Sequence, residues 1–206
     1  MDISEGPTVV GCDDGEIRKV GFQEYTTYAC VSMDSTAYGL YPRDAALGLL
    51  RVDGLEASSV IAVAARLLEA NPVAVILDSI TIAGFNVVSP PIIYRLVGAP
   101  VIVVYSYKPS YARLRRGALN LSTFKIIDRI IRLVDNAVPL KTRKGVLYAL
   151  LWGIEPPEAI KIVEKFQIHS RVPEPVRVAH YIASAASRLL RGCLAQPSSR
   201  GEQPPR

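Results

Sequence analysis

The amino-acid sequence predicts an α/β fold in which a mixed, partly parallel sheet is flanked by helices. Residues 73–77 and 100–105 are apolar runs without a charged side chain, which is typical of strands in a sheet that is covered on both faces. Residues 92–97 form a helical segment between them, and a strand–helix–strand order makes the two strands parallel neighbours. A chain of 206 residues that is 50% hydrophobic can bury one sizeable core. Ligands are expected beyond the carboxyl ends of such strands.

The first third of the chain predicts strands followed by a helix. Residues 8–12 are a short apolar run that ends at Asp13-Asp14-Gly15, which indicates a buried strand and a tight turn. Residues 20–52 interleave Tyr, Thr and Val with polar residues, a pattern that favours two or three antiparallel strands. Apolar residues at helical spacing over 60–68 predict a helix, which Ser58 or Ser59 could cap.

The remainder of the chain is predicted to be mainly helical. Residues 110–136 indicate two helices rich in arginine, and residues 146–152 fit a last strand or a short helix. Two prolines at 156 and 157 begin a helix that runs to residue 166, and residues 176–190 predict a final amphipathic helix. We expect one domain over residues 1–191 and a disordered tail over 192–206, where Pro, Ser and Gly are frequent.

Charge and cysteine content limit the class of protein. Twenty-four Lys and Arg against 19 Asp and Glu give a net charge of +5, which favours a polyanionic partner without requiring one. Cys12, Cys30 and Cys193 are widely spaced and form no C-x-x-C pair, so we expect buried thiols in a reducing cytoplasm. The first residues lack a signal-peptide pattern, and no apolar run approaches a membrane span of about 20 residues. A cytoplasmic protein with no membrane partner is expected.

Acidic residues follow three of the apolar segments. Asp13 and Asp14 end the first strand, Asp53 and Glu56 precede the first long helix, and Asp78 ends the central strand. A carboxylate in such a place is costly to desolvate unless it binds a metal, pairs with a cation or caps a turn. Mg²⁺ prefers oxygen ligands, and two ions about 4 Å apart can activate water and stabilise a leaving oxygen. Asp-Gly pairs are also frequent in turns for backbone reasons alone, so the turn alternative stays open.

Further polar residues could complete such a site. Arg177 precedes His180 by three residues on the predicted last helix, so both side chains share one helical face, where a cation could contact phosphate. Tyr105 and Lys108 follow the end of a strand and could stack on a base or hold backbone phosphate, with packing and solvation as the alternative.

Five motifs run in order from about Val9 to Ala186: Gly-Cys-Asp13-Asp14-Gly, Val-Asp53-Gly, Ile-Leu-Asp78, Ala-Gly-Phe-Asn86-Val-Val and Pro-Glu-Pro-Val-Arg177-Val-Ala-His180. Together they resemble the archaeal endonuclease dU family, which was formerly a domain of unknown function and is related to endonuclease V. The resemblance implies a ribonuclease H-like fold, a mixed sheet of about five central strands flanked by helices. It also implies that Asp13, Asp78 and His180 belong to the catalytic site. Asp53 or Glu56 would supply the remaining acidic ligand, with Asp53 preferred for its Val-Asp-Gly context.

The resemblance predicts an endonuclease that depends on Mg²⁺ or Mn²⁺ and cleaves DNA near deaminated bases such as uracil, in DNA repair. Structured RNA is a second candidate substrate, and we assign nucleic-acid contacts to Lys108, Arg177, Tyr105 and Asn86. The sequence departs from the family at two serines: the family usually has Asp-Gly where this chain has Asp78-Ser79, and a second aspartate where it has Ser89. These changes motivate the alternative of a non-catalytic nucleic-acid-binding protein with a degenerate metal site.

Overall fold

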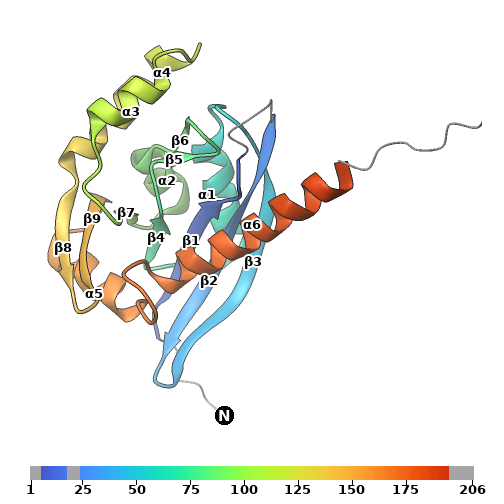
Figure 1. Ribbon diagram of the computed structural model, residues 1–206. Coiled ribbons are helices and arrows are strands. Elements are labelled where there is room, and N and C mark those ends of the chain that lie inside the picture. Colours follow the sequence, from blue (N-terminus) through green and yellow to red (C-terminus); the bar gives the residue numbers. More distant parts are fainter. Residues whose placement is uncertain (1–5, 18–23, 195–206) are drawn as a thin grey trace, which may run out of the picture.

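Seven strands form one twisted sheet with helices on both faces (Figure 1). The computed structural model describes residues 6–17 and 24–194. The strands of this sheet, in chain order, are β1 (Thr8–Asp14), β2 (Tyr25–Thr36), β3 (Gly39–Arg51), β4 (Ala74–Leu77), β7 (Val101–Tyr105), β8 (Val138–Thr142) and β9 (Gly145–Trp152). A separate two-stranded ribbon consists of β5 (Thr81–Ile82) and β6 (Asn86–Val87). The helices are α1 (Ala57–Leu67), α2 (Pro90–Val97), α3 (Tyr111–Ala118), α4 (Phe124–Ile131), the 3₁₀ helix η1 (Arg132–Asn136), α5 (Pro156–Lys165) and α6 (Glu174–Leu194).

The sheet has the order β3-β2-β1-β4-β7-β9-β8 and is parallel only at its centre. β1, β4 and β7 are parallel neighbours, and the other pairs are antiparallel. α2 connects β4 to β7 as the expected crossover. The prediction of a ribonuclease H-like mixed sheet flanked by helices is confirmed. Because Cys12 pairs with Leu77, the next residues, Asp13 and Asp78, leave adjacent strands at the same edge of the sheet.

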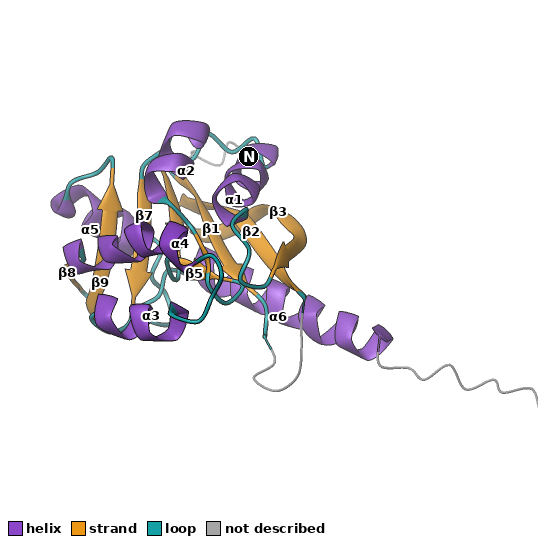
Figure 2. Ribbon diagram, turned by 90° about the horizontal axis from the view of Figure 1, so that it is seen from above, coloured by secondary structure: helices purple, strands orange, loops and turns teal. Residues whose placement is uncertain are grey.

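The two faces of the sheet carry different helices. α1 and α2 lie on one face and α6 crosses the other, as the view along the sheet shows (Figure 2). Alternate residues of β1 serve the two sides: Val10 and Cys12 belong to the core under α1, and Val9 belongs to the opposite core. Gly11 lies directly beneath the start of α6, where an added Cβ would come within 2.4 Å of the Pro175 carbonyl carbon. A glycine is therefore required for α6 to pack closely on β1.

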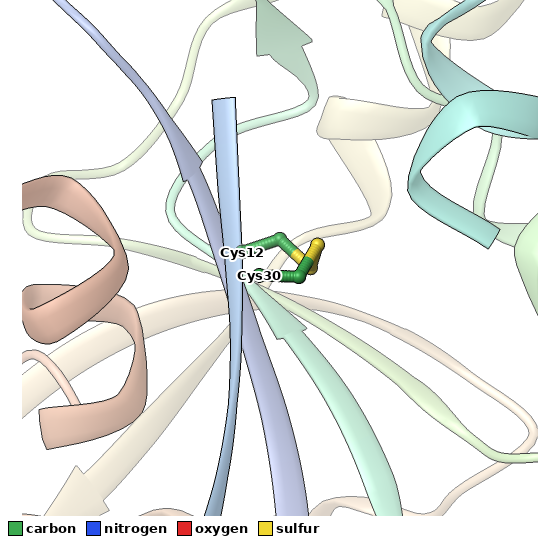
Figure 3. Close-up of a disulfide and its surroundings, with 2 residues drawn as sticks. All are labelled: Cys12 and Cys30. Carbon is green, nitrogen blue, oxygen red and sulfur yellow. A yellow bond between two sulfur atoms is a disulfide. The ribbon is translucent and has the colours of Figure 1, made fainter. Parts of the chain in front are cut away.

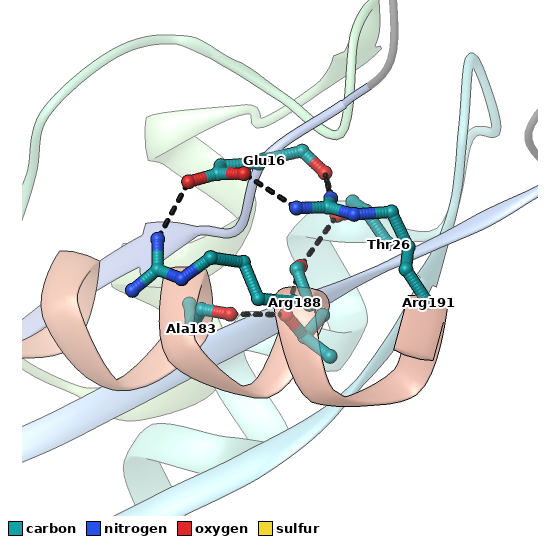
Figure 4. Close-up of polar contacts among 7 residues, drawn as sticks. Glu16, Thr26, Ala183, Arg188 and Arg191 are labelled. Carbon is teal, nitrogen blue, oxygen red and sulfur yellow. Dashed lines mark hydrogen bonds and ion pairs between the residues drawn. The ribbon is translucent and has the colours of Figure 1, made fainter. Parts of the chain in front are cut away.

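Polar contacts fix the far half of α6 against the first two strands (Figure 4). The Glu16 carboxylate accepts hydrogen bonds from Arg188 at 2.6 Å and from Arg191 at 2.5 Å, and these bonds lower the pKa of Glu16. The Thr27 hydroxyl donates to the Ala183 carbonyl at 2.6 Å, inside the buried interface. These contacts hold the axis of α6 in a fixed orientation over β1 and β2.

Several element predictions differ from the structure in detail. β1 continues through Asp14 instead of turning at Asp13, and residues 146–152 are a strand. α1 begins after Glu56, which is its N-terminal flanking residue, so the prediction of a serine cap is wrong. Strand β8 was not anticipated. α6 extends to residue 194, past the predicted start of the tail. Residues 195–206 of that tail lie outside the described residues, as do residues 20–23 of the predicted strand region.

The cysteine prediction is wrong for two of the three residues. Cys12 and Cys30 form a disulfide that links β1 to β2, with their Cα atoms 4.1 Å apart (Figure 3). The two residues are directly opposed in the antiparallel register and are fully buried. Their separation of 18 residues gave no sign of this pairing, because strand register cannot be deduced from spacing alone. Among the described residues, no helix combines the length and the apolar character needed to cross a membrane.

Candidate functional site

Two carboxylates lie side by side where the central parallel strands end. Asp13 ends β1 and Asp78 directly follows β4, its parallel neighbour. Asp13 occupies the same face of β1 as Gly11, so its side chain is directed towards α6. Both carboxylates line a cleft of about 330 Å³. Its other lining residues come from α6 and the loop before it: Ser170, Val172, Val176, Arg177, His180 and Tyr181.

His180 completes this cluster from α6. Its Nδ1 lies 2.8 Å from Oδ2 of Asp13, and the imidazole side chain is 53% exposed while Asp13 is nearly buried. With an ionised Asp13 the Nδ1–H donates to the carboxylate, which fixes the ring and leaves Nε2 as an acceptor on the opposite ring edge. This arrangement resembles the orientation of a histidine by a carboxylate in many hydrolytic sites.

The electrostatics of the site favour a cation. Burial and, to a lesser extent, the negative charges of Asp78 and Asp14 together raise the pKa of Asp13 to about 8. Burial also raises the pKa of Asp78, although the nearby His180 acts in the opposite direction. Like charges that are partly removed from water oppose ionisation, and a bound cation removes that penalty.

Asp14 serves the opposite side of β1. Its Oδ2 accepts a short hydrogen bond from the backbone N–H of Ala83, in the turn between β5 and β6. Burial raises the pKa of Asp14, whereas the Ala83 hydrogen bond lowers it. Asp14 therefore joins the end of β1 to the β5–β6 ribbon that follows Asp78. Its negative charge acts on Asp13 from the opposite face of β1.

Asp53 and Glu56 are placed away from the cleft. Oδ1 of Asp53 accepts the Phe85 N–H at 2.7 Å, and the Asp53 N–H donates to the Ala83 carbonyl at 2.9 Å. Glu56 accepts the N–H groups of Arg51 and Leu55, each at 2.9 Å. The structure thus does not bring either residue together with Asp13 and Asp78. Their predicted role as metal ligands remains a prediction that requires this loop to release its hydrogen bonds.

Asn86 and Tyr105 are also directed inward. Asn86 is fully buried; its Oδ1 accepts the Ala57 N–H at 2.9 Å and its Nδ2 donates to the Arg51 carbonyl at 3.0 Å. Tyr105 lies beside Asp78, and burial raises the pKa of its phenol. Asn86 holds the start of α1 against the β6 segment, and the Tyr105 hydroxyl is buried. The nucleic-acid contacts predicted for Asn86 and Tyr105 stay predictions.

Arg177 and Lys108 lie nearer to solvent. Arg177 lines the cleft, but its guanidinium is bound to the buried Glu174 at 2.8 Å and to the Tyr181 hydroxyl at 3.1 Å. Hydrogen bonds to Tyr181 and Glu174 raise the pKa of Arg177. Lys108 is exposed on the segment that follows β7. Sequence reasoning overlooked Tyr181 and Glu174, although their spacing of four and three residues from Arg177 places all three on one side of α6.

The two departures from the family pattern have local structural roles. The Ser79 hydroxyl lies 3.0 Å from that of Thr81, and the Ser89 backbone N–H donates to the Ser58 hydroxyl at 2.9 Å. Ser89 is buried at the start of α2. Neither serine lines the cleft.

The donor set suits a hard divalent cation. Asp13 and Asp78 offer carboxylate oxygens at one edge of the sheet, and one or two carboxylates together with waters and a substrate phosphate are a usual environment for Mg²⁺. Within residues 6–17 and 24–194, no three Asp, Glu, His or Cys side chains are close enough together to hold one ion between them.

Comparison with known proteins agrees with this fold. The sequence matches the endonuclease dU family over residues 5–187. It is 45% identical over 185 residues to a UPF0215 protein of Aeropyrum pernix, a match that covers 88% of this chain and 99% of the relative. A crystal structure of a protein of unknown function from Archaeoglobus fulgidus superposes with a TM-score of 0.71 at 27% identity, over 87% of this chain and 98% of the other. Ciona intestinalis endonuclease V, solved with a 24mer DNA containing an inosine followed by a ribo-adenosine, superposes with a TM-score of 0.53 at 13% identity, over 93% of this chain and 87% of the other. The chain belongs to the endonuclease dU family.

Proposed function

We propose that this protein is a divalent-metal-dependent endonuclease that cleaves phosphodiester bonds in DNA near deaminated bases such as uracil. The observation that carries the proposal is the convergence of Asp13, Asp78 and His180 in one cleft beyond the carboxyl ends of β1 and β4. Membership of an endonuclease family supports the reaction class.

Asp13 and Asp78 would hold the metal, which we expect to be Mg²⁺ or Mn²⁺. A divalent ion bound there would lower the pKa of a coordinated water and stabilise negative charge on the phosphate oxygens. The two aspartates contribute by presenting ionised oxygens from rigid strand ends, so little reorganisation is needed when charge develops. Asp14 adds a third negative charge nearby while its oxygen stays bound to the Ala83 N–H.

His180 positions the water and carries its proton. Asp13 holds Nδ1, so Nε2 remains available to accept a proton from a water in the cleft. The ring is half-exposed and lines the same cleft as Asp78, so a phosphate in that cleft could reach both. Arg177, fixed by Glu174, would limit where the phosphate can lie.

The choice of substrate rests on the relatives. The Ciona enzyme was solved with inosine-containing DNA, and the family is named for deoxyuridine. A deaminated base would leave the stack most readily where it is mispaired, which is one source of selectivity. Structured RNA is the second substrate to be tested.

The test is cleavage of end-labelled duplexes that contain uracil, hypoxanthine or no lesion, in Mg²⁺, Mn²⁺ or chelator. We expect lesion-dependent cutting by the wild type in metal only and its loss in Asp78→Asn. Asp44→Asn is the matched control, because Asp44 is exposed on β3 and its carboxylate accepts a hydrogen bond from the backbone N–H of Ala45, far from the cleft residues in sequence. Equal activity of Asp78→Asn and the control would remove Asp78 from the mechanism.

A non-catalytic nucleic-acid-binding protein is the competing function. Two observations favour it: Ser79 and Ser89 stand where the family usually has glycine and aspartate, and no third ligand joins Asp13 and Asp78 among the described residues. It predicts salt-sensitive binding to the same oligonucleotides without cutting in any metal. Binding without cleavage across all metals and lesions would therefore replace the nuclease proposal with this one.

A further inference from the structure

The positive charge of the chain is concentrated in one segment. Residues 107–136, which we term the basic arm, contain seven Lys or Arg and two Asp. All other residues together carry seventeen basic and seventeen acidic side chains, so the arm accounts for the whole net charge of +5. Charge that serves only solubility is normally spread over the surface with both signs mixed. The uneven distribution indicates a particular polyanionic partner.

Most of the cations of the arm have no partner within the described chain. Arg132 is paired with Asp128 at 2.9 Å, and Arg115 lies over the Phe124 ring. The other five make no ion pair with any described residue: Lys108 precedes α3, and four lie on the two helices, Arg113, Arg116, Lys125 and Arg129. The four on the helices are all exposed.

These four cations are arranged as neighbours on their helices. Arg113 and Arg116 are three residues apart on α3, and Lys125 and Arg129 are four residues apart on α4. α4 buries Ile127 and Ile131 in the core, which leaves its two cations exposed on the remainder of its surface. Like charges at these spacings weaken a helix. Both helices nevertheless carry such a pair of like charges, as expected if a bound anion neutralises their repulsion.

The basic arm begins beside the cleft. It begins two residues after β7, the parallel neighbour of β4, and Asp78 directly follows β4. Tyr107 is 79% exposed, and the Arg171 guanidinium lies over its ring at 5.9 Å. Arg171 lies between Ser170 and Val172, which both line the cleft. From there α3 and α4 extend away from the sheet, as the yellow-green elements of Figure 1 show.

We propose that the basic arm binds the phosphate backbone of a nucleic acid that extends out of the cleft. The inference rests on the proposed function, and it specifies the substrate as a chain that continues for several nucleotides beyond the cleavage point. Each arm helix has eight residues, a length of about 12 Å, over which duplex DNA carries about seven phosphate charges. Four unpaired cations match part of that charge.

The experiment measures equilibrium binding of the full-length protein by fluorescence anisotropy. The probe is a labelled 24-base-pair DNA without a lesion, in chelator so that no cutting occurs, over a range of KCl concentrations. In the arm variant Arg113, Arg116, Lys125 and Arg129 are all replaced by Gln. We expect its affinity at 0.1 M KCl to fall roughly a hundredfold or more, and the slope of log K against log [KCl] to flatten by about 3 to 4.

A matched variant controls for net charge. Arg66, Arg95, Lys161 and Lys165 are exposed on α1, α2 and α5 and also make no ion pair with a described residue. Replacing these four by Gln removes the same charge from the other helices. Its affinity should stay within about threefold of wild type, with a nearly unchanged salt slope. Thermal unfolding of both variants confirms that each is folded.

The outcomes separate this inference from the nuclease proposal. Equal losses in the two variants, or no loss in the arm variant, would overturn the arm proposal even if the wild type cuts uracil-containing DNA. Loss confined to the arm variant would support it even if no cutting is found under any metal. Unchanged DNA affinity together with lost binding to phosphatidylserine vesicles would assign the arm to a lipid surface and also overturn it.

Discussion

Asp13, which we propose as a metal ligand, shows how a buried carboxylate can oppose folding stability. Its carboxylate is nearly buried at the end of β1, and Asp78 and Asp14 add negative charge around it. Its pKa of about 8 means that the folded protein holds a proton that the unfolded chain has released above pH 4. Folding stability should therefore decrease as pH rises from about 4 to 8 and change little beyond that.

Replacement of Asp13 should reveal this cost. Asp13→Asn keeps an oxygen for the His180 Nδ1–H but cannot ionise, so without divalent metal it should stabilise the protein at pH 8.5 by about 2 kcal/mol. For a chain of this size that is a rise of roughly 4–8 °C in unfolding temperature. Below pH 4 the two proteins should unfold at similar temperatures. Calorimetry at both pH values checks this, and a destabilised variant at pH 8.5 would contradict it.

Asn86 is predicted to matter for stability and not for binding. Asn86→Ala leaves the buried Ala57 N–H and the Arg51 carbonyl without their partner, which should cost about 2 kcal/mol or more in urea unfolding. The exposed Asn120 provides the control, and Asn120→Ala should change stability by less than about 0.5 kcal/mol. Normal stability with weakened DNA affinity in Asn86→Ala would instead restore the direct contact predicted from sequence.

At the level of elements, hydrophobic periodicity predicted which segments form helices or strands better than it predicted which face of each helix is buried. The helical pattern over residues 60–68 correctly gave α1, yet Val63 and Leu67 are 56% and 70% exposed, and small residues such as Ala57 and Ala65 fill the interface instead. β8 was missed because it is a short edge strand. It contains Pro139 and Lys141, and a short segment with these residues resembles a loop in sequence.

The sequence identified the acidic residues at the strand ends, but it could not show on which face of the sheet each carboxylate lies. Asp13 and Asp14 are consecutive, so the alternation of a strand sends one towards His180 and the other towards Ala83. When Asp-Asp-Gly is interpreted as a turn, the two aspartates are not expected to lie on opposite faces of the sheet. Likewise, Asp53 and Glu56 follow a strand, which is a common place for metal ligands. The structure shows instead that both side chains accept hydrogen bonds from nearby backbone N–H groups.

The link between β1 and β2 gives a prediction for this pair of strands. The Cys12–Cys30 disulfide closes a loop with a separation of 18 residues, and constraint of the unfolded chain should make it worth about 3 kcal/mol. Reductant should lower the urea midpoint of the wild type but not that of Cys12→Ala/Cys30→Ala. Denatured without reductant, the wild type should expose one titratable thiol, that of Cys193. Three thiols under those conditions would show that the cysteines are unpaired.

For the whole molecule, the parallel centre of the sheet connects the site to global stability. β1 and β4 are neighbours in the middle of the sheet, so an ion held between their ends binds the folded protein and not the unfolded chain. The same β-sheet edge leads through β7 into the basic arm, so the carboxylates and the cations lie on one side of the fold. Metal and nucleic acid would then occupy neighbouring parts of one surface.

Divalent metal should therefore stabilise the protein in a pH-dependent way. At 100 times its Kd, Mn²⁺ should add about 2.7 kcal/mol, a rise of roughly 5–10 °C in unfolding temperature. The effect should grow between pH 6 and 9, because Asp13, with a pKa of about 8, must lose its proton to bind the ion. Asp78→Asn should abolish the shift, whereas Asp44→Asn, exposed on the edge strand β3, should retain it. Equal shifts in both variants, or one that is the same at pH 6 and pH 9, would place metal binding elsewhere than between Asp13 and Asp78.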